Sequence, residues 1–455
     1  MIEQAVVGGG MLGSVLALRL AEQGHRVTLI EAADHLGGVA DSWVLEPEAA
    51  GAAPVRWDRH YHVICRSDTA LRRLLAQLGL DREIRWRSTS TGFWDGHRLA
   101  PISSNRQILR NLPLGWLDKA RLGLTVLQAS LRHDRRRLEQ IPVLDWLRRW
   151  SGERVVERLW LPLLRAKLGS NAERVSAAFL WAVIQRLAKA RRQGLGAEQF
   201  GHVPGGYARI LERLSEELER SGVRIRLGTR VETIGPPGAG GPVVVLPGGE
   251  EARFERVAVT TPAAVAARLC PGLTSGELER LRAVEYQGIV CASLLLDRPL
   301  AGHYLLYATD PSLPFSTVVE MSSLVDPEEA FGGRHLVYLP RYVSADDPLF
   351  ETPEPELRER FLSGLESVYP SFDRGQVAAF RVSRVRHLLA LPTLGYSERL
   401  PPRETSIPGL SIVCSAHIVD GTLNVDETLK LAEAAARAAG TNGGGGGADD
   451  GEAAA

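Results

Sequence analysis

Three glycines near the start of the chain have the spacing of a phosphate-binding turn. Gly8, Gly10 and Gly13 fill a GxGxxG pattern. Gly8 permits a sharp turn, Gly10 lets the backbone approach a pyrophosphate, and Gly13 lets a helix lie close to a strand. Free N–H groups at the helix start bind phosphates. Glu31 follows about 20 residues later, where a carboxylate accepts hydrogen bonds from a ribose. The pattern predicts an adenine dinucleotide site.

The elements needed to position this turn are present on both sides of it. Residues 2–7 have strand composition, residues 11–24 place apolar side chains at helical spacings, and residues 26–32 read as a second strand. Met11 and Leu12 are the first residues of the expected helix. A strand, a glycine turn, a helix and a strand ending in an acid together favour a dinucleotide-binding unit over an ordinary turn.

Composition limits the class of protein. With 455 residues, of which 44% are hydrophobic, the chain is long enough for two or three domains. Basic and acidic residues both number 54, so no overall charge favours nucleic acid. The four cysteines are scattered without metal-ligand spacing, which predicts no metal site and a reducing compartment. The N-terminus lacks the basic region of a signal peptide, and no apolar run is long enough to span a membrane. These features predict a cytoplasmic protein.

The order of patterns along the chain predicts two domains, each built from separated segments. A nucleotide-binding start is followed by a mostly helical region from about residue 68 to 192 and by a second helix-and-strand region. Strands dominate from 284 to about 386, and the last ordered segment reads as strand, loop and helix. "VRWDRHYHVI" and "VRIRLGTRVETI" each alternate like a single strand. The glycine-rich tail is expected to be disordered.

Further segments, in the same order, resemble the FAD-dependent amine oxidase superfamily, which includes protoporphyrinogen oxidases and phytoene-type desaturases. The acid is followed by the glycine pair Gly37 and Gly38, with Val39 where the family usually has arginine. "LPLLRAKLGSNAERVSAAF" is similar to the family's substrate-domain pattern, "RLGTRVETI" to its adenine-contacting strand and "RVAVTTPAA" to a strand ending near the flavin. "LSIVCSAHIVDGTLNVDETLKLAEAAARAA" occupies the place of the closing FAD motif.

The resemblance implies an α/β fold, with a glutathione-reductase-like FAD-binding Rossmann domain and a mixed substrate domain that has a β-sheet and a helical insertion. The implied FAD-binding parts are 1–66, 201–283 and 387–440. The implied substrate-domain parts are 67–200, which is helical, and 284–386, which is sheet-rich, with a disordered tail at 441–455. The cofactor contacts that it implies are Gly8, Gly10, Met11, Leu12, Gly13, Glu31, Gly37, Gly38, Val39, Val231, Thr261, His417 and Leu423.

Catalytic residues are not identified by pattern alone, and three are candidates. If "DRHYH" is a strand, His60 and His62 share a face, and the resemblance places this region beside the flavin. The alternative is that one imidazole is a satisfied buried group and the other lies at the surface. Lys167 lies in the substrate-domain pattern. We favour a solvated side chain on a helix surface over a role in binding an anionic substrate. The family's amine oxidases hold a water at the flavin with a lysine from the sheet-rich part, and this chain has none between Lys189 and Lys430.

The expected function is therefore FAD-dependent oxidation of an apolar small molecule by hydride abstraction, which is dehydrogenation or desaturation. Because the chain has one GxGxxG motif, it has no obvious separate NAD(P)H domain, and oxygen or a quinone is favoured as electron acceptor. Two alternatives are a non-redox enzyme like UDP-galactopyranose mutase, with Arg165 and Arg384 as candidate pyrophosphate ligands, and a non-catalytic flavin protein.

Residues 103–150 mix apolar residues with repeated arginines. A solvated basic face is slightly favoured there over a peripheral contact with the inner face of a membrane.

Overall fold

A parallel five-stranded sheet forms the centre of one half of the molecule. The computed structural model describes residues 1–45, 54–94, 96–103, 105–111, 114–131, 134–192, 199–238, 241–419 and 422–441. The strand order in the sheet is β19-β13-β1-β2-β9. The bounds are β1 Glu3–Val7, β2 Arg26–Ile30, β9 Arg224–Arg226, β13 Arg256–Val259 and β19 Leu410–Ile412. The sheet thus joins strands from the beginning, middle and end of the chain, and the α/β fold with a Rossmann-type domain is confirmed.

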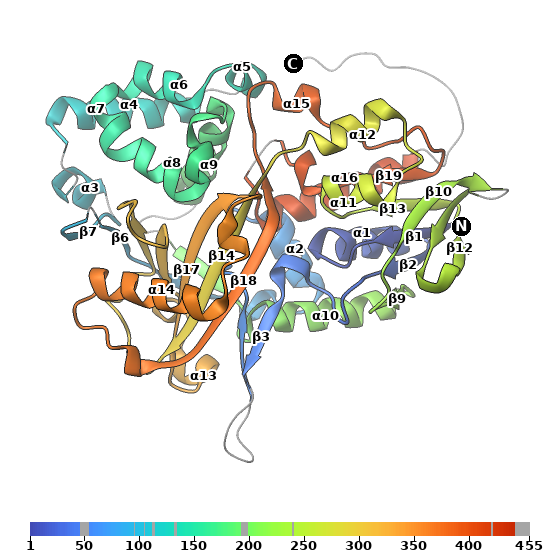
Figure 1. The fold of residues 1–455 in the computed structure, drawn as a ribbon, viewed down its shortest axis with the longest axis horizontal. Coiled ribbons are helices and arrows are strands. Elements are labelled where there is room, and N and C mark those ends of the chain that lie inside the picture. The colour runs from blue at the N-terminus through green and yellow to red at the C-terminus, as the bar shows by residue number, and fades with distance from the viewer. Residues whose placement is uncertain are drawn as a thin grey trace.

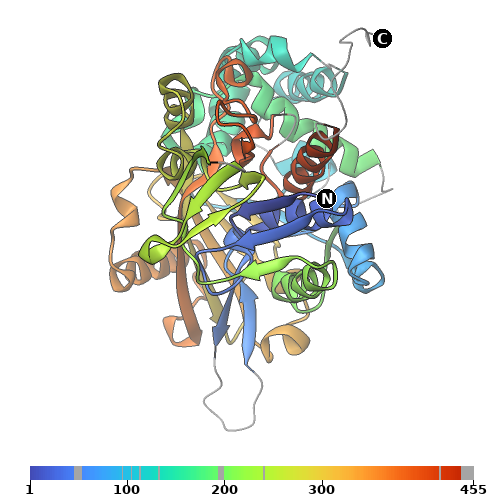
Figure 2. The same cartoon turned by 90° about the vertical axis from the view of Figure 1, so that its right-hand side faces the viewer.

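Helices pack on this sheet because their apolar faces meet it. Helix α1 (Met11–Glu22) is buried along most of its length, with Val15, Leu16 and Leu18 no more than 2% exposed. It packs against α10 (Gly206–Arg220) and α16 (Val425–Thr441), and α16 also contacts α2 (Thr69–Gln77). In Figure 2 the blue N-terminal strands lie between the red helix α16 and the green helix α10. The other face carries a three-stranded sheet and two helices, with bounds β10 Thr233–Gly238, β11 Gly241–Val245, β12 Glu251–Arg253, α11 Ala263–Leu269 and α12 Ser275–Arg282.

A seven-stranded sheet forms the second half, in the order β18-β14-β17-β16-β15-β6-β7. The bounds are β6 Thr91–Trp94, β7 Leu99–Pro101, β14 Tyr286–Leu296, β15 Leu305–Ala308, β16 Thr317–Glu320, β17 His335–Ser344 and β18 Val377–Ala390. Every residue of β14 is buried, because alternate side chains enter two separate apolar cores. Helix α14 (Glu354–Val368) covers one face, and the other face meets the segment that begins at β4 (Val55–Asp58).

Short helices form a separate group at the upper left of Figure 1, above the seven-stranded sheet. Their bounds are α3 Asn105–Asn111, α4 Trp116–Leu131, α5 Arg135–Glu139, α6 Val143–Ser151, α7 Glu153–Val155, α8 Leu161–Leu168 and α9 Ala177–Arg192. Helices α4 to α9 share one apolar core. A buried hydroxyl, Ser151 Oγ, lies 2.9 Å from the Trp160 Nε1 donor and 2.7 Å from Thr125 Oγ1, and joins α4 to α6.

The remaining elements are short. They are β3 Ser42–Leu45, which pairs with β4, β5 Arg85–Ser88, which pairs with β8 Gln199–His202, and the helices α13 Pro327–Phe331 and α15 Tyr396–Arg399.

Three local predictions differ from the structure. The strand expected to include His60 and His62 ends at Asp58, since the Asp58 carboxylate accepts a hydrogen bond from Tyr207 N (2.9 Å) and its carbonyl accepts one from the Tyr338 hydroxyl (2.7 Å). The single strand expected over 223–234 is two strands, β9 and β10, separated by a loop. The helical stretch contains β5, β6 and β7, and two of these join the large sheet. The expected tail lies outside the described residues apart from Thr441, the last residue of α16.

The buried carboxylate of Asp426 links α16 to the start of α2. Its Oδ1 accepts hydrogen bonds from Ala70 N (2.7 Å) and Leu71 N (2.9 Å), and its Oδ2 lies 2.8 Å from Lys430 Nζ. We expect Asp426→Ala to lower the free energy of unfolding by about 1–3 kcal/mol, because two N–H groups lose their acceptor. Urea denaturation measures this change. Glu251→Ala, which removes an exposed carboxylate paired with Arg253, is the control and stays within about 0.5 kcal/mol. Equal stability of the two variants would refute the role of Asp426.

Candidate functional site

The glycine turn has the geometry that the sequence predicts. Gly8 has φ +112°, and a Cβ on Gly13 would lie 1.8 Å from the Gly8 carbonyl oxygen, so no other residue fits there. Glu31 Oε2 accepts a hydrogen bond from Gly9 N at 2.5 Å, and Oε1 accepts one from Ala33 N at 2.8 Å. The acid at the end of β2 is therefore fixed against the turn, with its oxygens at the place where a ribose would bind.

The second glycine pair lies directly on the first. Gly37 N donates to Gly9 O at 3.0 Å, and Gly37 forms an isolated parallel bridge with Gly10. A Cβ on Gly38 would lie 3.3 Å from Gly10 Cα. On the open side of Gly10, by contrast, a Cβ would meet no atom within 4 Å. Val39 follows the pair and is 39% exposed.

Other expected cofactor contacts lie around this turn. Val231 is buried in the core that also contains Val7 and Ile30. Thr261 follows β13, and its Oγ1 is buried without a partner in the described part of the chain. Met11 and Leu12 bury their side chains in the core, so a contact with a ligand would have to come from their backbone.

Thr260 was not predicted as a site residue. Its Oγ1 lies 3.0 Å from Val7 O and 3.1 Å from Gly8 O, so it braces the turn from the neighbouring strand. Two adjacent threonines in "VAVTTP" gave no signal as to which one would face the turn.

The loop between β19 and α16 is held in place by hydrogen bonds from a side chain to the backbone. His417 Nδ1 lies 3.1 Å from Cys414 N and Nε2 lies 3.0 Å from Pro401 O. Burial lowers the His417 pKa, so the imidazole is a neutral brace with both nitrogens in use. Leu423 lies half-buried in the loop before α16, and Asn424 Oδ1 accepts from Glu427 N at 3.1 Å to cap that helix.

The two candidate histidines lie in the segment after β4. His60 Nε2 lies 3.0 Å from Ser383 Oγ on β18, and His60 Nδ1 is buried without a partner among the described residues. His62 stacks on the Tyr207 ring, with 4.6 Å between centroids, and its Nδ1 lies 4.0 Å from Asp58 Oδ2. Burial lowers the pKa of His60 to about 3 and that of His62 to about 4. Both imidazoles are therefore neutral at pH 7, and neither lies at the surface as the alternative for this segment supposed.

This segment adjoins both the glycine pair and Lys167. Arg59 N donates to Asp41 O at 2.8 Å, three residues after Gly38, and burial raises the pKa of Asp58 to about 7. Tyr61 lies on the other side, where its hydroxyl is 2.7 Å from the hydroxyl of Tyr342, which accepts from Lys167. The structure thus brings His60, His62 and Lys167 into one region.

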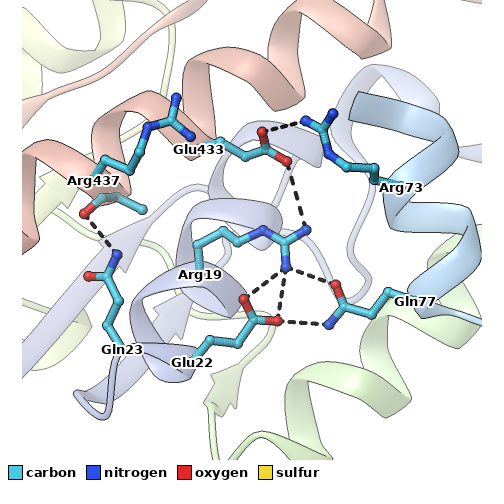
Figure 3. A pocket seen from close by; sticks show the side chains of 8 residues that line it. Arg19, Glu22, Gln23, Arg73, Gln77, Glu433 and Arg437 are labelled. Carbon is cyan, nitrogen blue, oxygen red and sulfur yellow. Dashed lines mark hydrogen bonds and ion pairs between the residues drawn. The ribbon is translucent and has the colours of Figure 1, made fainter. Parts of the chain in front are cut away.

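A separate polar hollow of about 440 Å³ lies on the outer side of α1, α2 and α16 (Figure 3). Arg19 contacts Glu22 and Gln77 there, and Glu433 lies 2.9 Å from Arg73. The hollow lies at the C-terminal half of α1, about three helical turns from the glycine turn. Since Arg19 and Arg73 already pair with the carboxylates of Glu22 and Glu433, it is not the candidate site.

Comparison with known proteins decides which dinucleotide the turn binds. The family model described as flavin containing amine oxidoreductase matches residues 15–438. The chain belongs to this family. The predicted resemblance is thereby confirmed, and the cofactor is FAD.

The relatives in this family are distant. A 15-cis-phytoene desaturase from Capsicum annuum is 23% identical over 250 residues, which cover 51% of this chain and 41% of the desaturase. A candidate protoporphyrinogen oxidase from Exiguobacterium sp. 255-15 has a similar fold, with TM-score 0.76, 20% identity and coverage of 97% of this chain and 99% of that one. Reduced UDP-galactopyranose mutase superposes with TM-score 0.73 at 17% identity, covering 97% and 96% of the two chains.

The residues present fit FAD. The open side of Gly10 leaves room for a pyrophosphate, Glu31 stands at the ribose position, and the unpartnered Thr261 Oγ1 offers a polar contact. The residues that would hold FAD are those of the two glycine turns, Val231 and the loop before α16. FAD supplies hydride acceptance when bound, and the protein supplies orientation and electrostatics.

Gly10→Ala tests the cofactor cradle separately from folding. The new methyl group meets no protein atom within 4 Å, so the apoprotein folds and loses at most about 1 kcal/mol at this N-cap position. The methyl fills the pyrophosphate space, and we expect FAD affinity to fall at least about tenfold in a flavin fluorescence titration. Gly123→Ala, on α4 and also free of contacts, is the control. Unchanged FAD affinity in Gly10→Ala would contradict the assignment.

Proposed function

We propose that this flavoprotein dehydrogenates an apolar small molecule, with FAD accepting a hydride from a C–H or C–N bond. The observation that carries the proposal is that the segment beside the cofactor turn presents neutral groups. His60 and His62 are uncharged at pH 7, and Tyr61 lies between them in the chain. A neutral lining suits a substrate that carries no charge near the reacting bond.

The curated relatives support this class of reaction. The Capsicum annuum relative is named a desaturase, and desaturation is removal of two hydrogens. The chain spans about two fifths of that desaturase's length, so the reaction is proposed here on the site's chemistry together with the relationship.

The electron acceptor that we propose is oxygen or a quinone. The chain has one GxGxxG motif, and FAD takes it. The sequence therefore offers no second motif of this kind for NAD(P)H.

Candidate acyclic hydrocarbons, cyclic tetrapyrroles and amines should be tested by mixing each with the FAD-loaded protein without oxygen. We expect one apolar class to bleach the flavin absorbance, and admission of oxygen or a soluble quinone to restore it. A protein that stays yellow with all classes, and instead converts UDP-galactofuranose after dithionite reduction, would establish the mutase reaction.

No feature of the described residues favours the mutase. Arg165 pairs with Glu173 at 2.9 Å, whereas Arg384 donates to Thr352 O at 2.8 Å. The two arginines have different partners on different elements.

We also propose that the protein works at the inner face of a membrane through helix α4. Its inward face carries Thr125 and Gln128 beside Ala129, whereas four of its five leucines point to solvent. The exposed fractions are Trp116 78%, Leu117 82%, Leu124 48%, Leu127 55% and Leu131 64%. These five residues, here called the α4 surface, form one stripe because 117, 124 and 131 are spaced by seven.

Charge supports a lipid partner for the α4 surface. Arg106, Arg110, Arg136, Arg149 and Arg158 lie on the surrounding helices, and anionic lipid attracts such residues. Among the described residues, no helix has the length and hydropathy needed to span a bilayer. All four cysteines are unpaired, in keeping with a cytoplasmic location.

Replacing Trp116 and Leu117 together by serine tests membrane contact. We expect binding to phosphatidylglycerol vesicles to fall at least about tenfold in co-sedimentation, because two large apolar side chains no longer enter the bilayer. Leu394→Ser, at a leucine that is 42% exposed elsewhere, should leave binding unchanged. Wild-type protein that stays in the supernatant would overturn the proposal.

A further inference from the structure

Lys167 reaches from helix α8 to the seven-stranded sheet. Its Nζ donates to the Tyr342 hydroxyl at 2.7 Å and lies 4.1 Å from the centre of that ring. Tyr342 is only 5% exposed, whereas the Lys167 side chain is accessible to solvent. A ligand can therefore reach this amine at the junction between the helical group and the sheet, which is a common place for ligand sites.

The Lys167 cluster, defined as Lys167, Tyr342 and Tyr61, has more donors than acceptors. An ammonium group has three N–H donors, and Tyr342 accepts one of them. If Tyr342 then donates to Tyr61 across their 2.7 Å contact, the hydroxyl hydrogen of Tyr61 is also left over. Two N–H groups and one O–H group thus remain for an acceptor from outside the cluster.

The charges around Lys167 also favour an anion. Within the described residues no carboxylate lies within ion-pair distance of its Nζ, whereas Arg165 on the same helix pairs with Glu173. The charged group that influences it is Arg186 on α9, another cation. Cys291, which influences the two tyrosines, is neutral at pH 7 because burial raises the pKa of its thiol. Protein packed around the Nζ displaces part of its water, and this desolvation, helped by Arg186, lowers the pKa of Lys167 to about 8 while the side chain keeps solvent contact.

The cluster is connected to the cofactor end of the site. Tyr61 lies between the two neutral histidines, and Arg59 in the same segment contacts the loop that carries the second glycine pair. A molecule that reaches from the two histidines to Lys167 meets neutral imidazoles at one end and a cation at the other.

We propose that the Lys167 cluster binds a carboxylate of the substrate. The substrate class is then an amphipathic acid, whose apolar segment is oxidised at the flavin while its carboxylate accepts hydrogen bonds from Lys167 Nζ and the Tyr61 hydroxyl. This inference rests on the proposed dehydrogenase function and specifies its substrate class.

Binding of phenylacetate and of the uncharged, equally sized phenylacetamide to the FAD-loaded protein tests the site by calorimetry. We expect phenylacetate to bind wild type at least about tenfold more tightly than phenylacetamide. In Lys167→Met the two should bind equally, whereas Lys167→Arg should keep the preference because it keeps the charge. Arg165→Met, which removes a cation from the same helix, is the matched control and should behave as wild type.

The pH dependence gives a second readout. A bound carboxylate stabilises the ammonium form, so binding takes up protons, and phenylacetate affinity should fall as pH rises through about 8. A titration in two buffers of different ionisation enthalpy measures the uptake in wild type and its loss in Lys167→Met.

Equal binding of the two ligands to wild type, binding of neither, or a preference that survives in Lys167→Met would overturn the proposal. These outcomes are distinct from failure of the dehydrogenase function, which is read from flavin content and flavin bleaching. The protein could also contain FAD and prefer phenylacetate, yet be reduced by no apolar compound. That result would support the anion site and contradict the proposed reaction.

Discussion

Close contact between two stretches of backbone underlies the site. Gly10 and Gly38 approach so nearly that a side chain on Gly38 would press on the neighbouring Cα, and Gly13 admits no Cβ at all against the carbonyl of Gly8. The carboxylate of Glu31 and the hydroxyl of Thr260 then fix the turn from the strands on either side. Because these contacts hold the turn in shape without a ligand, we expect little ordering cost to oppose dinucleotide binding.

Burial sets the chemistry of the groups beyond this turn. Desolvation favours the uncharged form of each buried group, so His60 and His62 remain neutral and Asp58 titrates near neutrality. A substrate bound beside the two imidazoles would find hydrogen-bonding groups without a full charge on either ring. Lys167 differs because solvent reaches it, and its charge lies at the far side of two tyrosines from the histidines.

Helix α4 has an unusual distribution of apolar side chains for a surface helix. In most surface helices the apolar face turns inward, but α4 buries Thr125 beside Ser151 and exposes leucines. A hydroxyl contact and small residues let α4 pack closely on its neighbours. Exposed leucines cost stability in water, and a lipid surface would remove that cost. Lys167 lies on α8 of the same helical group.

The sequence by itself determined the local unit and its ligand class. Glycine spacing, the acid at the end of β2 and the apolar periods of α1 and β14 depend on neighbours in the chain, so they identified a dinucleotide-binding turn and the α/β class. The ordered resemblance of further segments pointed to the family and to FAD. Tertiary structure decided what depends on contacts between distant segments. His60 and His62 left the expected strand because Tyr207 and Tyr338, far along the chain, bind the backbone and side chain of Asp58. Thr260 rather than its neighbour braces the turn, strands β6 and β7 join a sheet made of later segments, and Lys167 meets Tyr342 across 175 residues. No local pattern encodes these pairings, since each is selected by packing and hydrogen bonding in the complete fold.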